Sequence, residues 1–142
     1  LIASSVRAFA AQRLVRRLCT HCSKPADNSS LGQQLLAEAV QNGADIASAM
    51  SEAPNWRSPQ GCDLCNQTGY LDRLGLYEAA LVDSELQQAI TRRATMSEIV
   101  ETARRKGFQT LMEDGLLKAR RGLTSVEEVM RVVGARTEEA AA

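Results

Sequence analysis

Two pairs of cysteines, each spaced C-x-x-C, constrain this chain more than any other feature of its sequence. Cys19 with Cys22 and Cys62 with Cys65 account for all four cysteines among the 142 residues. A C-x-x-C turn brings two thiolates to one side of a tight loop, and two such turns complete the four-sulfur tetrahedron that suits Zn²⁺. Such a shell leaves no position for water, so we expect these four residues to bind a structural zinc ion.

Simple energetics favour a metal at this spacing. Closing the 39 residues between the two pairs costs on the order of 3 kcal/mol, against about 10–16 kcal/mol contributed by a structural zinc ion. Two disulfides, or a redox-active C-x-x-C, are the alternatives. Both are disfavoured because the chain is not rich in cysteine and its start does not resemble a signal peptide. His21 lies inside the first pair, and with four cysteines available we expect it to face solvent.

Residues 1–18 have the composition of a helix with apolar residues on two opposite faces. Two apolar faces indicate two packing partners, so we expect this segment to be part of a longer protein. The first 26 residues also contain no acidic residue. Four arginines there are either a solvated face or a contact with an acidic surface or phosphates, and they are Arg7, Arg13, Arg16 and Arg17.

Between the cysteine pairs, the stretch SSLGQQLLAEAVQ predicts a helix that begins after a serine cap and ends at Asn42. Trp56 follows in a loop with two prolines, and we expect it to cover the metal site. After the second pair, LGLYEAALV has the composition of a short strand, which with QTGYLDR predicts a small β-hairpin.

From Asp83 onward, capping signals repeat at short intervals. Asp83 is expected to cap one helix, and three T-x-x-E capping boxes open the next three, at Thr95 with Glu98, Thr110 with Glu113 and Thr124 with Glu127. Each apolar stripe has helical spacing, and each helix is too short to persist alone in water. The predicted fold is therefore mainly α with a small β-hairpin, a tetracysteine zinc subdomain being followed by a compact helical bundle.

Several functions are disfavoured by what the printed sequence lacks. It contains no G-x-x-x-x-G-K-[ST] phosphate loop, no G-x-G-x-x-G and no H-E-x-x-H, and its one histidine offers little for acid–base chemistry. We therefore expect no catalytic and no cofactor-binding residues in this segment. The formal net charge of zero gives no general attraction to nucleic acid or to an anionic membrane.

A series of short motifs, taken in order, resembles one family. The motifs are AQRLVRRLCTHC, then GCDLCNQTGYLDRLGLYEAALVD, then GFQTLMEDGLLKARRGLTSVEEVMRVV, and together they are similar to the C-terminal region of type II secretion and type IV pilus assembly ATPases. On this resemblance the four cysteines match the family's tetracysteine metal site. The other matching positions are Arg73, Gly75, Tyr77 and Glu78, Met112, Asp114, Gly115 and Lys118, and Gly122, Thr124, Glu127, Glu128 and Val129. Thr20, Leu71 and Asp72 depart from it, standing where a proline, a basic residue and a glycine are usual.

The resemblance implies a domain organisation and a setting. Residues 1–18 would be the last helix of a RecA-like motor domain, 19–80 the tetracysteine zinc-binding subdomain, 81–134 a helical C-terminal extension and 135–142 a frayed tail. ATP and Mg²⁺ would bind only in the motor domain upstream, so the parent protein would be an ATPase. It would be a cytoplasmic homohexamer docked on the inner membrane through platform proteins, powering protein secretion or pilus extension.

Two other functions are compatible with paired cysteines. A zinc-ribbon module that binds nucleic acid is the main alternative, because the first 26 residues are rich in arginine; no aromatic residues are interleaved with them, however. A chaperone-like zinc domain would require repeated C-x-x-C-x-G-x-G units, and the sequence has one loose copy.

Overall fold

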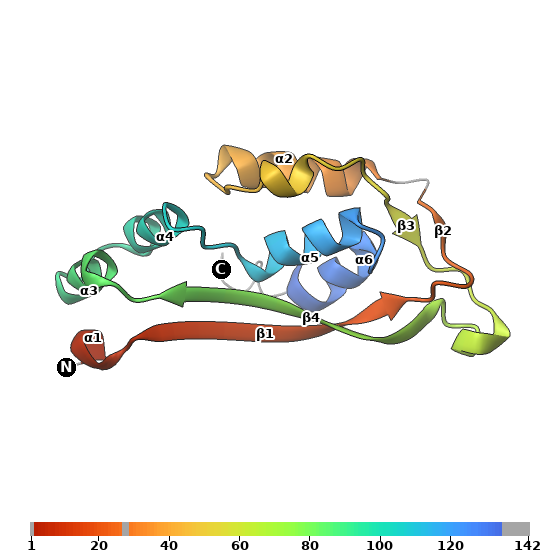
Figure 1. The fold of residues 1–142 in the computed structure, drawn as a ribbon, viewed down its shortest axis with the longest axis horizontal. Coiled ribbons are helices and arrows are strands. Elements are labelled where there is room, and N and C mark those ends of the chain that lie inside the picture. The colour runs from red at the N-terminus through yellow and green to blue at the C-terminus, as the bar shows by residue number, and fades with distance from the viewer. Residues whose placement is uncertain (1, 27–28, 135–142) are drawn as a thin grey trace.

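A computed structural model describes residues 2–26 and 29–134, and its central feature is a long antiparallel ribbon. Strand β1 (Ala8–Leu18) pairs with β4 (Tyr70–Leu81), from Ala8 opposite Leu81 to Leu18 opposite Tyr70 (Figure 1). The helix predicted for residues 1–18 is therefore wrong: only α1 (Ile2–Ser5) is helical there. The expectation of a mainly α fold is accordingly met only in part.

The ribbon forms because β1 finds a partner strand about 50 residues away. Val15 and Leu76 are buried on its inner face, where they pack against Leu111 and Val133. The alternation of strand residues between two faces also produces two apolar sides, which the sequence alone had suggested to be two helical faces. Pairing with β4 satisfies the backbone of β1, and a segment without that partner would have no reason to be extended.

The predicted hairpin after the second cysteine pair is also wrong, because residues 70–81 form one continuous strand. The register places Arg16 opposite Arg73 but Leu18 opposite Tyr70, so β4 carries one extra residue in a β-bulge. Asp72 lies in this bulge with a φ of 74°. A positive φ of this kind favours glycine, which explains why glycine is usual at this position in the family that the motifs resemble.

The segment between the cysteine pairs supplies a helix to the main hydrophobic core. Helix α2 (Ser30–Gln41) is followed by the 3₁₀ turn η1 (Ser48–Met50), and two short strands, β2 (Lys24–Pro25) and β3 (Arg57–Ser58), pair beside it. Leu36 and Ile46 pack with Leu116 and Val129 of the later helices. Trp56 belongs to this core too, packed against Gly32, so it does not act as a cover over the cysteines.

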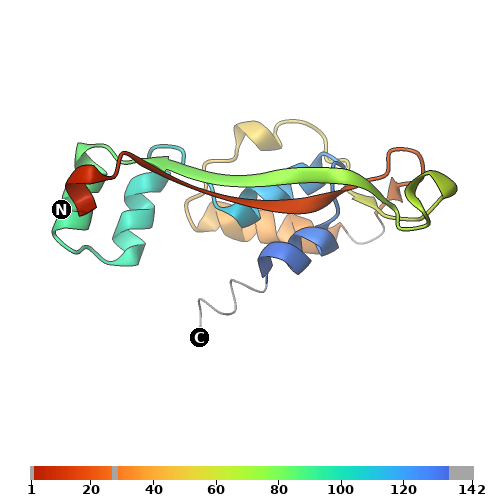
Figure 2. The same ribbon diagram turned by 90° about the horizontal axis from the view of Figure 1, so that it is seen from below.

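The helices that follow the ribbon divide into two groups rather than one compact bundle. Helices α3 (Ser84–Thr91) and α4 (Met96–Arg104) lie with α1 at one end of the ribbon, where Figure 2 shows them apart from the rest. Helix α5 (Leu111–Arg120), α6 (Val126–Val129) and its π-helical continuation η3 (Met130–Gly134) pack on the middle of the ribbon, beneath α2. A single bundle was predicted because the capping signals mark helix starts but do not say where each helix packs.

Most of the predicted helix caps are confirmed. The Asp83 carboxylate accepts the N–H of Leu86, and Thr95 with Glu98 forms a capping box. Thr110 with Glu113 forms another. The last cap is displaced by one residue, because Ser125 rather than Thr124 caps α6 and accepts the N–H of Glu128.

Thr124 is used elsewhere, since its hydroxyl donates to the carbonyl of Arg16 and so joins α6 to the edge of β1. In the part of the chain that the structure describes, no helix is both long and apolar enough to cross a bilayer. The tail expected to be frayed, residues 135–142, lies outside the described residues.

Candidate metal centre

The two cysteine pairs meet at the end of the ribbon that lies farthest from α1. The first pair follows β1 directly, and the N–H of Cys19 donates to the carbonyl of Gly69 at 2.9 Å. The second pair brackets the 3₁₀ turn η2 (Asp63–Cys65), which leads through two residues of positive φ, Asn66 and Gln67, into β4. The pairing of β1 with β4 therefore brings the two C-x-x-C turns side by side.

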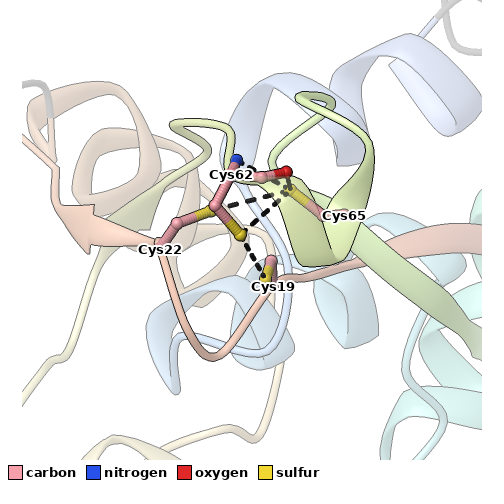
Figure 3. Close-up of side chains that lie close together, drawn as sticks. All are labelled: Cys19, Cys22, Cys62 and Cys65. Carbon is pink, nitrogen blue, oxygen red and sulfur yellow. Dashed lines mark hydrogen bonds between the residues drawn. The ribbon is translucent and has the colours of Figure 1, made fainter.

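The four sulfur atoms form one compact cluster (Figure 3). Sγ–Sγ distances are 3.9 Å for Cys19 and Cys62, 3.8 Å for Cys22 and Cys65, and 3.7 Å for Cys62 and Cys65. All four sulfurs lie within 4.8 Å of one another. Zn–S bonds of about 2.3 Å in a tetrahedron place neighbouring sulfurs about 3.8 Å apart, so the cluster has the dimensions of a zinc site.

These distances also exclude the disulfide alternative for this conformation. A disulfide holds its sulfurs at about 2.05 Å, and all four cysteines are free thiols here. His21 is exposed and does not belong to the sulfur cluster, as expected. The donor set is therefore four sulfurs from two buried and two partly buried residues, which matches a soft, closed metal site rather than a calcium or magnesium site.

Backbone N–H groups point at the sulfurs and stabilise negative charge on them. Gly61 N–H donates to Cys22 Sγ at 3.3 Å, and the N–H groups of Cys62 and Gly69 both donate to Cys65 Sγ at 3.2 Å. Burial, the largest influence on Cys65, raises its pKa, but these two N–H groups together with the thiols of Cys62 and Cys22 outweigh it and lower the pKa to about 6. Cys65 is thus arranged to be a thiolate at neutral pH, the form that binds metals.

The pKa of Cys62 is shifted in the opposite direction. Its largest influence, a backbone hydrogen bond at Cys65, lowers the pKa, but burial and the neighbouring sulfurs of Cys65 and Cys22 raise it to about 11. Four sulfurs this close cannot all carry negative charge without a positive charge among them. A divalent cation at the centre of the cluster would remove that conflict, so the residues present fit a zinc ion.

The backbone around the cluster is tightly packed. A Cβ on Gly69, whose φ is 79°, would lie 2.5 Å from Cβ of Pro59 and 2.8 Å from the nitrogen of Gln60. The Arg57 side chain holds the first turn from the other side, since its Nε donates to the Ser23 hydroxyl at 2.9 Å and its Nη2 donates to the Ser23 carbonyl. The position of the sulfurs is therefore set by packing and hydrogen bonds as well as by the ribbon.

A buried carboxylate anchors the ribbon beside the metal centre. Glu128 is 1% exposed and accepts the backbone N–H of Arg16 at 3.0 Å and its guanidinium at 2.8 Å. Arg131 also donates to Glu128. The Arg16 guanidinium stacks over the ring of Tyr70, and the Tyr70 hydroxyl lies 2.7 Å from the Ser125 hydroxyl.

Burial, the largest influence on Glu128, raises the pKa of its carboxyl, but hydrogen bonds from Arg131 and Arg16 outweigh it and lower the pKa to about 2. The motif comparison included Glu128, but its burial and its contacts were not predicted because Glu127 occupied the expected capping position. Of the four arginines considered for an external contact, Arg16 is engaged within the chain. Arg7 and Arg17 are exposed, and Arg13 donates to the adjacent carbonyl of Gln12.

The motif residues after the cysteines meet where α5 covers the free edge of β4. The N–H of Tyr77 donates to the Asp114 carboxylate at 2.9 Å, and the Lys118 ammonium donates to the carbonyl of Gly75 at 2.8 Å. Asp114 and Lys118 also pair with each other at 2.7 Å. This ion pair satisfies backbone groups that an edge strand would otherwise leave free for pairing with another chain.

Glu78 and Gly115 complete the contact between β4 and α5. The Glu78 carboxylate accepts the N–H of Leu111 in the first turn of α5. Gly115 permits the close approach, because a Cβ there would lie 2.7 Å from Val129 and 3.0 Å from Leu76. In this fold the motif M-x-D-G-x-x-K therefore has a structural role, because its residues cover one edge of the ribbon that carries the cysteines.

Comparison with known sequences was consistent with these features. Residues 1–131 match the family described as type II/IV secretion system protein. The type IV pilus assembly ATPase PilB of Thermus thermophilus is 41% identical over 91% of this chain and 14% of its own length. The type II secretion system ATPase E of Vibrio cholerae is 36% identical over 93% of this chain and 24% of its own length.

The PilB protein of Pseudomonas aeruginosa is 40% identical over 92% of this chain and 22% of its own length. The chain thus spans less than a quarter of the length of these three relatives. The matched residues include the cysteines, the ribbon and the helices that seal it, which confirms the resemblance first seen in the motifs. The chain belongs to the type II/IV secretion system protein family.

Proposed function

We propose that this chain is the metal-binding and helical module of a secretion or pilus-assembly ATPase, and that a structural zinc ion holds its ribbon closed. The observation that carries the proposal is the convergence of four sulfurs, all within 4.8 Å, in a member of this family. The module itself has no catalytic role. The relatives are named ATPases. In the parent protein ATP, with Mg²⁺, would bind in a motor domain elsewhere.

The metal would have a mechanical role at this position, as a cross-link between the two strands. Strands β1 and β4 are separated by residues 19–69, so no short turn connects them at the cysteine end. A zinc ion bound by Cys19 and Cys22 on one side and by Cys62 and Cys65 on the other would replace that turn with a rigid cross-link. The ribbon would then transmit force as one unit between α1, α3 and α4 at one end and the metal centre at the other.

The proposed setting follows from the family. The module would belong to a homohexamer in the cytoplasm, bound to the inner membrane through platform proteins of the secretion or pilus machine. Two of its exposed arginines, Arg7 and Arg17, would be available to contact a neighbouring subunit. Residues 1–18 would adjoin the RecA-like motor domain as part of a strand ribbon rather than as a helix.

Metal content tests the site directly. We expect the purified chain to contain about one zinc ion, as two C-x-x-C turns that share one ion require. Cys62→Ser should lose most of this zinc, whereas His21→Ala, in the loop of the first pair, should keep it. Equal zinc content in the wild-type chain and Cys62→Ser, measured by elemental analysis after gel filtration, would disprove the assignment of ligands.

Two functional assays test the rest of the proposal. The chain alone should show no ATP turnover, and measurable hydrolysis by a pure sample would contradict the separation of motor and module. In the parent protein, Cys62→Ser should reduce ATP-driven assembly, and His21→Ala should not. Salt-dependent binding of the chain to single-stranded DNA would instead favour the zinc-ribbon alternative, because phosphate contacts weaken steeply as salt rises.

A further inference from the structure

The face of the ribbon that turns away from the helices, its outer face, has no charged side chain over most of its length. Its residues form four cross-strand pairs, Ala8 with Leu81, Ala10 with Ala79, Gln12 with Tyr77 and Leu14 with Gly75. They lie on this face because Val15 and Leu76, the next residues along each strand, are buried in the core. Figure 2 views the ribbon from this side, with α2 and α5 behind it.

The large side chains of the outer face are exposed. Leu14 is 48% exposed, Tyr77 is 55% exposed and Leu81 is 79% exposed. Single apolar side chains are common on protein surfaces. A continuous uncharged stretch along two strands is instead typical of a surface that another element covers.

The backbone of β1 also has unpaired groups along one edge. The N–H of Arg16 donates to Glu128 and its carbonyl accepts from Thr124, so the backbone of Arg16 points away from β4. Backbone groups alternate in direction along an antiparallel strand, so every second residue before Arg16 points the same way. These residues are Ala8, Ala10, Gln12 and Leu14. The Gln12 carbonyl accepts from the adjacent Arg13 side chain, and no other hydrogen bond reaches these outward groups from the described part of the chain.

Neighbouring parts of the ribbon have their edges covered. On β4, the ion pair of α5 binds the outward groups of Gly75 and Tyr77. Near the metal centre, the N–H of Leu18 in β1 donates to the carbonyl of Leu123. The open edge of β1 is therefore residues 8–14, about the length of an average strand. Folded proteins usually pair or cover an exposed strand edge of this length, because it would otherwise pair with other chains.

We propose that a strand from the motor part of the parent protein pairs with the open edge of β1, so that the ribbon extends a sheet of the motor. Such pairing rests on the proposed function and gives the module a rigid attachment to the motor. The added strand would bind the outward N–H and carbonyl groups of Ala10, Gln12 and Leu14. Elements beside that strand would cover the uncharged outer face.

The relatives and the character of the surface favour the motor as the occupant. The chain spans 14%, 22% and 24% of the length of three relatives named ATPases, so most of each relative lies outside the matched region. An apolar contact without charges is typical of a permanent interface, such as one within a single protein, rather than of a transient one. The open edge and the outer face therefore suit a permanent contact within the parent protein.

A second copy of this chain suits the open edge less well. Strand β1 carries three arginines and no acidic residue, and they are Arg13, Arg16 and Arg17. Edge-to-edge pairing of two β1 strands would bring these cations together without a counter-charge, which is unfavourable. A strand of different sequence would avoid this repulsion.

Hydrogen exchange of single amides, followed by NMR on the zinc-loaded chain, tests whether the edge is open. The N–H groups of Ala10, Gln12 and Leu14 should exchange at least about a hundredfold faster than those of the residues between them, which bond to β4. Equal protection of the two sets in the chain alone would overturn the proposal. An exchange rate that falls as chain concentration rises would also overturn it and would identify a second copy as the occupant.

The same three amides test the occupant in the zinc-loaded parent protein, where mass spectrometry with fragmentation resolves single residues. They should exchange at least about tenfold more slowly there than in the chain alone, because a partner strand now binds them. Exchange at the same rate in both proteins would refute the pairing. Zinc content, measured on the same samples, reports on the proposed function separately.

Proline variants distinguish the open edge from the paired one. Gln12→Pro removes an N–H that binds nothing in the chain, so the variant chain should keep its zinc and unfold at nearly the wild-type urea concentration. Ala11→Pro is the control and should unfold at much lower urea, because it removes a bond to β4. In the parent protein, Gln12→Pro should return the amides of Ala10 and Leu14 to fast exchange, and unchanged protection there would contradict the pairing. If Gln12→Pro does not fold, the wild-type comparison of chain and parent decides alone.

Discussion

Replacing Glu128 by glutamine tests whether the buried carboxylate holds the ribbon to the helices. Lowering the pKa of this carboxyl from its ordinary 4.5 to about 2 corresponds to about 3 kcal/mol of stability at neutral pH. The Arg16 and Arg131 side chains are 46% and 59% exposed, so salt screens part of this energy. We therefore expect Glu128→Gln to lower the free energy of unfolding by about 2–3 kcal/mol at pH 7.

The same shift predicts how the effect depends on pH. Because the pKa of Glu128 is lower in the folded chain than in the unfolded chain, its stabilisation is present above pH 4.5 and is lost as pH falls toward 2. At pH 3 about two-fifths of it should remain. The stability difference between wild type and Glu128→Gln should therefore shrink by about three-fifths between pH 7 and pH 3.

Urea unfolding followed by circular dichroism measures both quantities. Glu127→Gln is the matched control, because Glu127 is the exposed neighbour in the same helical turn. Acid release of a bound metal would affect both variants alike and so cancel in their difference. The reasoning is refuted if the two variants lose the same stability at pH 7, or if the difference between them does not change with pH.

Other positions test the metal centre and the helix starts. Cys62→Ser should lower the thermal midpoint of the zinc-loaded chain and bring it close to that of the chelator-treated wild type, as seen by calorimetry; an unchanged midpoint would contradict a structural metal. In urea unfolding, Gly69→Ala should lower stability far more than Gly107→Ala. An added Cβ meets Pro59 at the first site and nothing within 4 Å at the second, where only the positive φ costs about 1 kcal/mol. Equal losses of stability would rule out the packing argument. Thr110→Ala should lower the free energy of unfolding in urea by about 1 kcal/mol because the helix cap is lost. Glu113→Ala should lower it by about 3 kcal/mol, because this change also leaves Arg104 without its partner. A larger loss for Thr110→Ala would be inconsistent with that ion pair.

The candidate site was predictable from the sequence because its chemistry is concentrated in four residues of one type. The C-x-x-C spacing brings two thiolates together locally, and two such pairs supply the four sulfurs of a closed zinc site. The supporting residues were not predictable in the same way. Glu128 stands beside a second glutamate in the same turn, and only the packing of α6 on β1 decides which of the two is buried.

Local signals in the sequence determined the four cysteines of the candidate metal site, the positions of most helix starts and the family. Capping residues such as Asp83, Thr95 and Thr110 act within one helical turn, so they can be read without knowing the fold. The tertiary structure alone decided that β1 is a strand and that α2 packs over α5 to complete the main core. An extended segment is stable only when a distant partner satisfies its backbone, and the partner of β1 lies about 50 residues further along the chain.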